Sequence, residues 1–212
     1  MVIEKELISK LKKIDGNGFF KKNPFQIFGS KEHKYELNNC LSEGKILDFE
    51  KANQIELPFE YRNFIKNIGN GGVGPAYGVF KLEDWNFELD IENKNFLNEN
   101  FPYTEKWNLI YGGNEDDEDY TESEEFKNWE LECFNEKHIY GSIRICHYGC
   151  AIYYFLVVSG LEKGNVWIDA RANDEGIYPM ITETKSRYNF AEWYNEWINE
   201  SLKKLNNKKN DA

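Results

Sequence analysis

The stretch IYGSIRICHYGCAIYYFLVVSGLEKGNVWIDA, residues 139–170, decides the fold of this chain. It contains three runs rich in β-branched and aromatic residues, which favour extended strands. The last two runs are joined by SGLEKGN (159–165), a loop of a kind that joins the strands of a β-hairpin. The pattern therefore predicts an antiparallel meander. Its middle run, 152–158, is apolar on both faces, so we expect it at the centre of the sheet with helices against at least one face.

Helical periodicity appears at both ends of the chain. Apolar residues recur at helical spacing over 3–14, and this first helix is expected to stop at the turn sequence DGNG, 15–18. At the other end, an aromatic and aliphatic stripe over 190–205 predicts a terminal helix, with Asn189 and Glu192 as its cap pair. Core packing is the favoured interpretation of that stripe.

A glycine-rich stretch, GNGGVGP (69–75), lies between a predicted helix and a predicted strand. The preceding LPFEYRNFIKNIG (57–69) predicts a helix with Pro58 at its start and Gly69 as a left-handed C-cap. The following AYGVFKL (76–82) predicts a strand. A phosphate-binding loop requires the opposite order, a strand before the glycines and a helix after them. The order therefore favours a tight helix-to-strand turn with positive φ angles. Upstream, Ser42 is expected to cap a helix that runs through Ile46 and Phe49.

The composition fits one globular domain with a substantial core. The chain has 212 residues, of which 41% are hydrophobic and 16% aromatic, with a mean hydropathy of −0.72. The opening MVIEKELISKLKKI lacks a continuous apolar run, and no later run approaches the roughly 18 apolar residues that a membrane span requires. We therefore expect a cytoplasmic protein without membrane contact. Its four cysteines are expected to be reduced and buried: Cys40, Cys133, Cys146 and Cys150.

The net charge of −11 argues against direct nucleic-acid binding, because affinity for phosphates comes largely from clustered Lys and Arg. A basic protein is the natural complement of such a chain. A metal site is not supported either, because Cys133, His138, Cys146, His147 and Cys150 lack the spacing of zinc ligands. We expect neither a metal nor a cofactor.

Two residues near the end of the third strand, Asp169 and Arg171, leave an enzymatic alternative open. They are compatible with a catalytic acid beside an electrophile. They are equally compatible with an ion pair at a strand end, which is the preferred interpretation. Ser159 lacks the glycine context of a nucleophile elbow, so no nucleophilic serine is predicted.

Four segments of the chain occur in an order and spacing that are typical of one known family. They are FGSKEHKYELN (28–38), FEKANQIELPFEYRNFIKNIGNGGVGPAYGVFKL (49–82), HYGCAIYYFLVVSGLEKGNVWIDARANDEGIYP (147–179) and FAEWYNEWI (190–198). The most specific pieces are LP-x-x-Y-x-x-F-I with its NGG exit, and the GC…LVVSG…GNVW hairpin. Together the segments resemble the SUKH superfamily, which includes fungal cell-wall assembly regulators and many bacterial immunity proteins.

The resemblance, with the periodicity, implies a single α+β domain. We expect an antiparallel or mixed sheet of about four to six strands, packed against several helices that include the N- and C-terminal ones. Residues 1–23 are assigned to an N-terminal helix and linker, 24–205 to the SUKH-like domain and 206–212 to a disordered tail. The implied function is that of an immunity protein, a monomer or a dimer, that binds and neutralises a toxin domain, often a nuclease.

Two other functional classes remain as alternatives. The fungal members imply a regulatory scaffold that gathers several signalling proteins. A small-molecule or carbohydrate binder would use the aromatic content, but it requires exposed, stacked rings. The immunity function, without catalysis, is the preferred hypothesis.

An acidic segment, EDDEDYTESEEFKNWELECFNEKH (115–138), interrupts the resemblance. Thr121 and Glu124 predict a capping box at the start of a helix. Phe126, Trp129 and Cys133 are then expected to mark the inner face of that helix.

The acidic run before this predicted helix has two interpretations. It is either a solvated loop or a mimic of a phosphate backbone that covers the basic groove of a nuclease toxin. Two tryptophans are candidate anchors, although packing in the core is the commoner role of such residues. The candidate partner-binding residues are Glu115, Asp116, Asp117, Glu118, Asp119, Trp85 and Trp107.

Overall fold

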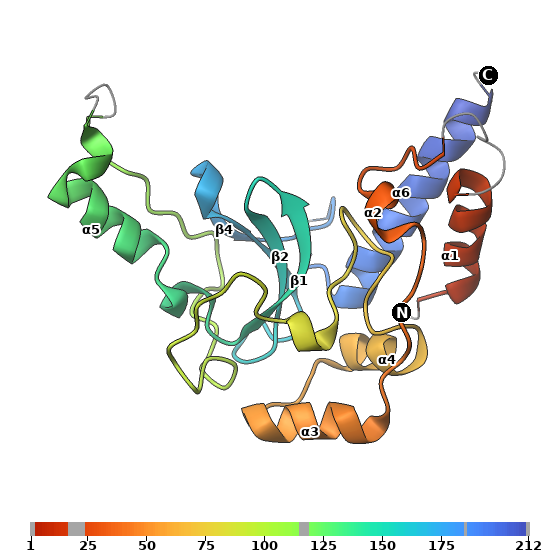
Figure 1. Ribbon diagram of the computed structural model, residues 1–212, viewed down its shortest axis with the longest axis horizontal. Helices are drawn as coiled ribbons and strands as arrows, with labels where there is room; N and C mark the ends of the chain where they lie inside the picture. The colour runs from red at the N-terminus through yellow and green to blue at the C-terminus, as the bar shows by residue number, and fades with distance from the viewer. Residues whose placement is uncertain (1–2, 17–23, 115–118, 185, 211–212) are drawn as a thin grey trace.

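A four-stranded antiparallel sheet lies at the centre of the computed structural model, which describes residues 3–16, 24–114, 119–184 and 186–210 (Figure 1). The strands follow one another in chain order, so the predicted meander is confirmed. They are β1 (Ser142–Gly149), β2 (Ile152–Val157), β3 (Val166–Ala170) and β4 (Gly176–Pro179).

The register of the sheet places β2 between β1 and β3, as the apolar run predicted. Phe155 of β2 pairs with Trp167 of β3, and Trp167 is fully buried. The fourth strand was not predicted. It spans four residues that include a glycine and a proline, which is too short to show an alternating pattern.

Both outer strands of the sheet are covered by other parts of the chain. Val79 forms a bridge with Cys146 of β1, and Trp107 forms a bridge with Ile177 of β4. The predicted strand over 76–82 is wrong, because only Val79 pairs before the chain turns into the short helix η2 (Leu82–Asp84). Covered edges of this kind protect a sheet from pairing with other chains.

Six α-helices surround the sheet in the described part of the chain (Figure 1). Helices α1, α2 and α6 lie on one side of it, and α5 stands apart on the other. None of these helices is both long enough and apolar enough to cross a membrane. Their bounds are α1 (Lys5–Leu11), α2 (Ser30–His33), α3 (Glu43–Asn53), α4 (Phe59–Asn67), α5 (Glu124–Cys133) and α6 (Phe190–Asn210).

The core lies where α4 and α6 pack together beside the sheet. Phe64 of α4 contacts Phe190 and Tyr194 of α6 with ring centroids 5.1 Å apart in both pairs, and all three side chains are fully buried. Two predicted caps are confirmed. The Ser42 hydroxyl accepts from the N–H of Lys45, three residues on, and Asn189 and Glu192 each accept a hydrogen bond from the backbone N–H of the other.

The glycine-rich stretch is an architectural corner, as predicted. Gly71 (φ 75°) and Gly72 (φ 101°) adopt left-handed conformations, and a Cβ at Gly72 would lie 2.4 Å from the carbonyl oxygen of Glu36. Gly69 is not the left-handed C-cap that we predicted. The C-cap is instead Ile68, in a right-handed conformation, and Gly69 is needed because a Cβ there would lie 2.9 Å from the side chain of Leu37.

The chain ends differ from the predicted boundaries. Helix α6 continues through Asn210, so the predicted tail over 206–212 is helical as far as it is described. A helix that is already anchored adds further turns easily, because nucleation is its costly step. At the other end, Ile8 and Leu11 of α1 belong to the same core as α6.

The prediction for the cysteines holds for two of the four. Cys133 and Cys146 are buried free thiols, whereas Cys40 and Cys150 are exposed. Cys150 is exposed because it lies in the turn between β1 and β2, with a positive φ of 50°.

Candidate functional site: an acidic concave surface

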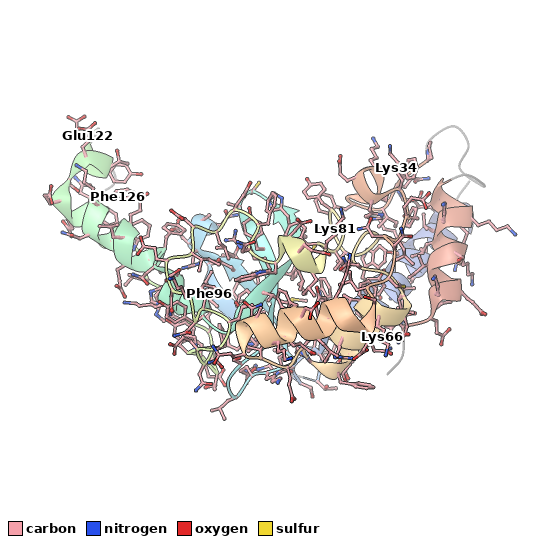
Figure 2. All side chains as sticks on the ribbon, turned by 60° about the horizontal axis from the view of Figure 1, so that its bottom comes forward. Lys34, Lys66, Lys81, Phe96, Glu122 and Phe126 are labelled. Atoms are coloured by element: carbon pink, nitrogen blue, oxygen red, sulfur yellow. The ribbon has the colours of Figure 1, made fainter. Side chains whose placement is uncertain are left out.

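Charge is strongly segregated along this chain. Residues 83–137 contain eighteen Asp and Glu but four Lys, a net charge of −14, whereas the whole chain carries −11. The rest of the chain therefore carries a net charge of +3. Figure 1 shows this acidic half, residues 83–137 in yellow-green to green, extending from the centre of the molecule out to α5. In Figure 2, Glu122, in the short turn that precedes α5, lies far from Lys34 and Lys66 at the opposite end.

Helix α5 is held to the molecule by a small aromatic cluster of its own. Phe126 and Trp129 pack on Tyr111, with ring centroids 5.2 and 5.7 Å away, and the Trp129 indole donates to the Leu109 carbonyl at 2.8 Å. The predicted inner face of this helix is thus confirmed. The predicted Thr121–Glu124 capping box is wrong. A short 3-10 turn takes up Tyr120–Glu122, so the helix starts later and the Ser123 hydroxyl accepts from the N–H of Phe126 at 3.0 Å.

A concave surface of about 660 Å³ lies where α5 and the loop after η2 meet the sheet. Its rim carries carboxylates from two segments that are more than thirty residues apart in the sequence. We call this feature the acidic surface, and its rim residues are Glu88, Asp90, Glu92, Glu130 and Glu136.

A buried ion pair forms the floor of the acidic surface. The Arg171 guanidinium donates to both carboxylate oxygens of Asp169 at 2.7 Å, and its remaining nitrogen donates to the carbonyl of Cys133 at 2.9 Å. Asp169 and Arg171 are 5% and 4% exposed. The strand-end ion pair predicted from the sequence is therefore confirmed. Because both oxygens of Asp169 are already bound, the arrangement gives no support to a catalytic acid at this position.

Arg144 extends the floor toward the rim. Its guanidinium carbon lies 3.7 Å from the centroid of the Tyr153 ring, and one of its terminal nitrogens donates to the carbonyl of Phe87 at 2.6 Å. Burial lowers the pKa of Arg144, whereas the nearby charge of Asp169 acts in the opposite direction. The Tyr153 hydroxyl donates to Glu88, and burial followed by this bond raises its pKa to about 12.

The rim carboxylates fall into two groups. Glu88 accepts from Tyr153, and Glu136 accepts from the backbone N–H groups of Glu92 and Asn93 at 3.1 Å, so both hold the local structure. By contrast, the side chains of Asp90, Glu92 and Glu130 form no ion pair with any residue in the described ranges. Their charges are available to a partner.

The predicted acidic run lies mostly outside the described residues. Glu115, Asp116, Asp117 and Glu118 are not described, and Asp119 is exposed immediately before the 3-10 turn that leads into α5. In the sequence, the run therefore precedes helix α5, which forms one side of the acidic surface.

The two tryptophans proposed as anchors are partly buried and pack against the core. Trp85 lies 5.7 Å from the buried ring of Phe96, and Trp107 stacks on His138 with centroids 4.0 Å apart. Neither lines the acidic surface. The apolar side chains exposed there are instead Leu131, which is 72% exposed, and Phe134, which is 45% exposed.

Sequence reasoning missed the residues that surround the acidic surface. The density of acid over 83–92 was visible in the sequence, but nothing local shows that this segment lies beside Glu130. Leu131 falls outside the apolar stripe of its helix, which was the available signal that it faces away from the cluster.

Known proteins give no indication of the function of this chain. The sequence matches no protein-family model, and no curated protein or solved structure matches it. Within the described ranges, no three His, Cys, Asp or Glu side chains are grouped so that they could hold a metal ion. The fold and the site define a strongly acidic α+β domain with a charged concave surface on one half.

Proposed function

We propose that this chain is an immunity protein of the SUKH type, which binds a basic toxin domain through its acidic surface and blocks it without catalysis. The observation that carries the proposal is the set of unpaired carboxylates, Asp90, Glu92 and Glu130, around a concave surface on a half with a net charge of −14. Unpaired like charges repel one another, and a basic partner relieves that repulsion.

The exposed apolar residues fit the same role. Leu131 and Phe134 lie at the acidic surface and are 72% and 45% exposed, so they are available for burial by a partner. Interfaces gain most of their affinity from a few such desolvated contacts, while surrounding charges speed association and exclude wrong partners. Steering raises association rates by about 10- to 1000-fold at low salt, which suits an inhibitor that must meet a toxin before the toxin acts.

The partner is tested first by a pull-down with the tagged chain. The tagged chain is the bait, and it is tested against C-terminal domains of polymorphic toxins encoded beside its gene, at low and high salt. A single stoichiometric toxin partner is expected. Several weak cellular partners instead would favour the regulatory scaffold.

The acidic surface is then tested by isosteric neutralisation. A triple variant, Asp90→Asn, Glu92→Gln and Glu130→Gln, is expected to slow association with the toxin about tenfold at low salt and much less at high salt. Glu88 and Glu136 are left unchanged because they hold the local structure.

A matched control removes the same charge elsewhere. Glu4, Glu32 and Glu56 are exposed and lie outside the acidic half, so changing all three to Gln alters the net charge equally. Their variant should associate at nearly the wild-type rate. Equal slowing by both triple variants would mean that net charge, rather than this surface, governs association. Neutralising Glu115–Asp119 separately shows whether the run before α5 contributes.

A further inference from the structure

A second site lies on the opposite face of the sheet. Tyr153 and Tyr154 are neighbours on β2, and successive residues of a strand point to opposite faces. Tyr153 lines the acidic surface, whereas Tyr154 lines a groove of about 480 Å³ beside α6. We call it the aromatic groove, and its ring side chains are Phe28, Tyr148, Tyr154, Tyr188, Trp193 and Trp197.

The rings form a continuous path along this groove. Phe28 and Tyr148 have centroids 5.3 Å apart, Tyr148 and Tyr154 are 6.0 Å apart, and Tyr154 lies 5.4 Å from Trp193. Two of them are open to solvent, since Phe28 is 49% exposed and Tyr148 is 44% exposed. Exposed aromatic surface of this kind marks binding sites more often than chance allows.

Five of the six ring side chains that line the groove carry a hydrogen-bond donor. Over the described part of the chain, none of their hydroxyl or indole N–H groups donates to another protein group. The donors are the hydroxyls of Tyr148, Tyr154 and Tyr188 and the indole nitrogens of Trp193 and Trp197.

Charged acceptors lie along the α6 wall. Glu196 and Glu200 are one helical turn apart, both are exposed, and both line the groove. Burial, followed by the negative charges of Glu196, Glu183, Glu192 and Glu200, raises the pKa of the Tyr188 hydroxyl. Glu196 and Glu200 give the α6 wall a negative stretch, in which Glu200 also pairs with Lys203 at 3.4 Å, and Lys204 lines the groove one turn beyond Glu200.

These features specify the chemistry of an occupant. It must offer apolar surface and hydrogen-bond acceptors, with a positive charge at one end. A helix fits poorly, because its carbonyl groups are already bonded within the helix. An extended segment has free carbonyls, and proline keeps a segment extended without any internal hydrogen bonds.

We propose that the aromatic groove binds an extended, proline-rich peptide segment with a Lys or Arg placed against Glu196 and Glu200. The rings of Phe28, Tyr148 and Tyr154 pack on the prolines, and the tyrosine hydroxyls donate to the peptide carbonyls. Proline-rich segments lose little entropy on binding because they are already extended in solution. The site is independent of the toxin-binding function proposed above.

The test uses the whole chain and an array of short synthetic peptides. The array varies the spacing of the prolines and places Arg at either end, and each peptide has a counterpart with Pro replaced by Ala. Binding is followed by polarisation of a fluorescent label on the peptide. A subset with Arg at one end is expected to bind, and its Ala counterparts about tenfold more weakly.

Two substitutions of exposed residues locate the binding. Tyr148→Ala should weaken it about tenfold, the size typical of an interface hot spot. Glu196→Gln should weaken binding of Arg peptides several-fold but leave a peptide with Gln in place of Arg unaffected. The control is Leu161→Ala, because Leu161 is 90% exposed in the loop between β2 and β3 and does not line the groove.

Three results would overturn the proposal. The first is that no member of the array binds. The second is binding that Tyr148→Ala does not weaken, which would place the peptide elsewhere. The third is equal affinity for Pro and Ala peptides. Oligosaccharides or a free apolar dye that bind in place of the peptides, and lose binding with Tyr148→Ala, would assign the groove to a small ligand.

Discussion

The two halves of this molecule are built differently. Where α4 and α6 pack together beside the sheet, large side chains such as Phe64, Trp167 and Tyr194 are fully buried. In the acidic half, the aromatic residues of α5 are half-buried, and Leu131 on the same helix is 72% exposed. We call the first region the packed half. It comprises the sheet, the glycine-rich corner (69–75) and all the described α-helices except α5.

This difference in burial suggests that one half stabilises the fold and the other is free to bind a partner. Burial of apolar surface is the main favourable contribution to folding, so the packed half should supply most of the unfolding free energy. Segments with few buried contacts open locally at lower cost, and they are the segments that partners reorganise. Helix α5, in which Cys133 is the one buried residue, has the properties of such a segment.

The largest expected effect comes from the packed half. Phe64→Ala should lower the free energy of unfolding by about 3–5 kcal/mol, because it removes a fully buried ring and leaves a cavity between α4 and α6. Chemical denaturation measures the change. Phe59→Ala on the same helix is the control, since Phe59 is 78% exposed and should be close to neutral.

Phe126→Ala applies the same truncation to the acidic half. It should cost clearly less than Phe64→Ala in global unfolding, because Phe126 is half-buried and contacts α5 and its neighbouring loop. If both variants lost the same free energy of unfolding, the two halves would contribute equally to global stability, contrary to the difference in burial.

The next effect concerns the glycine corner of the packed half. Gly72→Ala should destabilise the chain by about 1–3 kcal/mol from its positive φ alone, and the 2.4 Å approach to the Glu36 carbonyl adds to this cost. Gly44→Ala is the matched control. Gly44 lies in α3 with no atom closer than 4.0 Å to an added Cβ, so alanine should be neutral or stabilising there. If Gly72→Ala left the free energy of unfolding unchanged, glycine would not be required at this corner.

Patterns within the packed half made its fold predictable. The meander and the caps at Ser42 and Asn189 follow from periodicity and local hydrogen bonding, which depend on residues a few positions apart. Where the prediction was wrong, a non-local contact decided. Gly69 is constrained by Leu37 and not by the end of its own helix.

For the acidic surface, the sequence predicted the negative charge but not the residues that come together. The excess of Asp and Glu was evident, but Asp90 and Glu130 meet through the fold, and no pattern in either segment encodes that meeting. The aromatic groove was hidden for the opposite reason. Trp193 and Trp197 lie in a stripe that indicates a core, and the stripe does not show that part of it faces solvent.

His33, a buried histidine in the packed half, should make the stability of the chain depend on pH. Burial lowers the pKa of His33 to about 4, although the charge of Asp15 opposes the shift. Above pH 6.5 the imidazole is neutral whether the chain is folded or unfolded. Between pH 6.5 and 4 only the unfolded chain takes up the proton, so the free energy of unfolding falls as the pH falls.

His33→Asn should reduce this acid sensitivity by about 1–2 kcal/mol between pH 7 and pH 5. Asparagine does not titrate, and its side-chain oxygen can accept from the N–H of Tyr35 as the imidazole nitrogen does at 3.0 Å. Denaturation at both pH values measures the effect. His138 also has a pKa lowered by burial and should account for part of the remaining slope. An unchanged slope in His33→Asn would place the acid sensitivity outside the packed half.

The smallest effect should be confined to α5. Ser123→Ala removes the hydroxyl that accepts from Phe126 N–H, and should lower the local stability of α5 by about 1 kcal/mol. Thr121→Ala is the control, because Thr121 lies in the preceding 3-10 turn and does not cap the helix. Hydrogen exchange of the α5 amides should quicken in the first variant and not in the second. If Ser123→Ala lowered global stability by the same amount, α5 would open together with the packed half. Helix α5 could then not reorganise around a partner on its own.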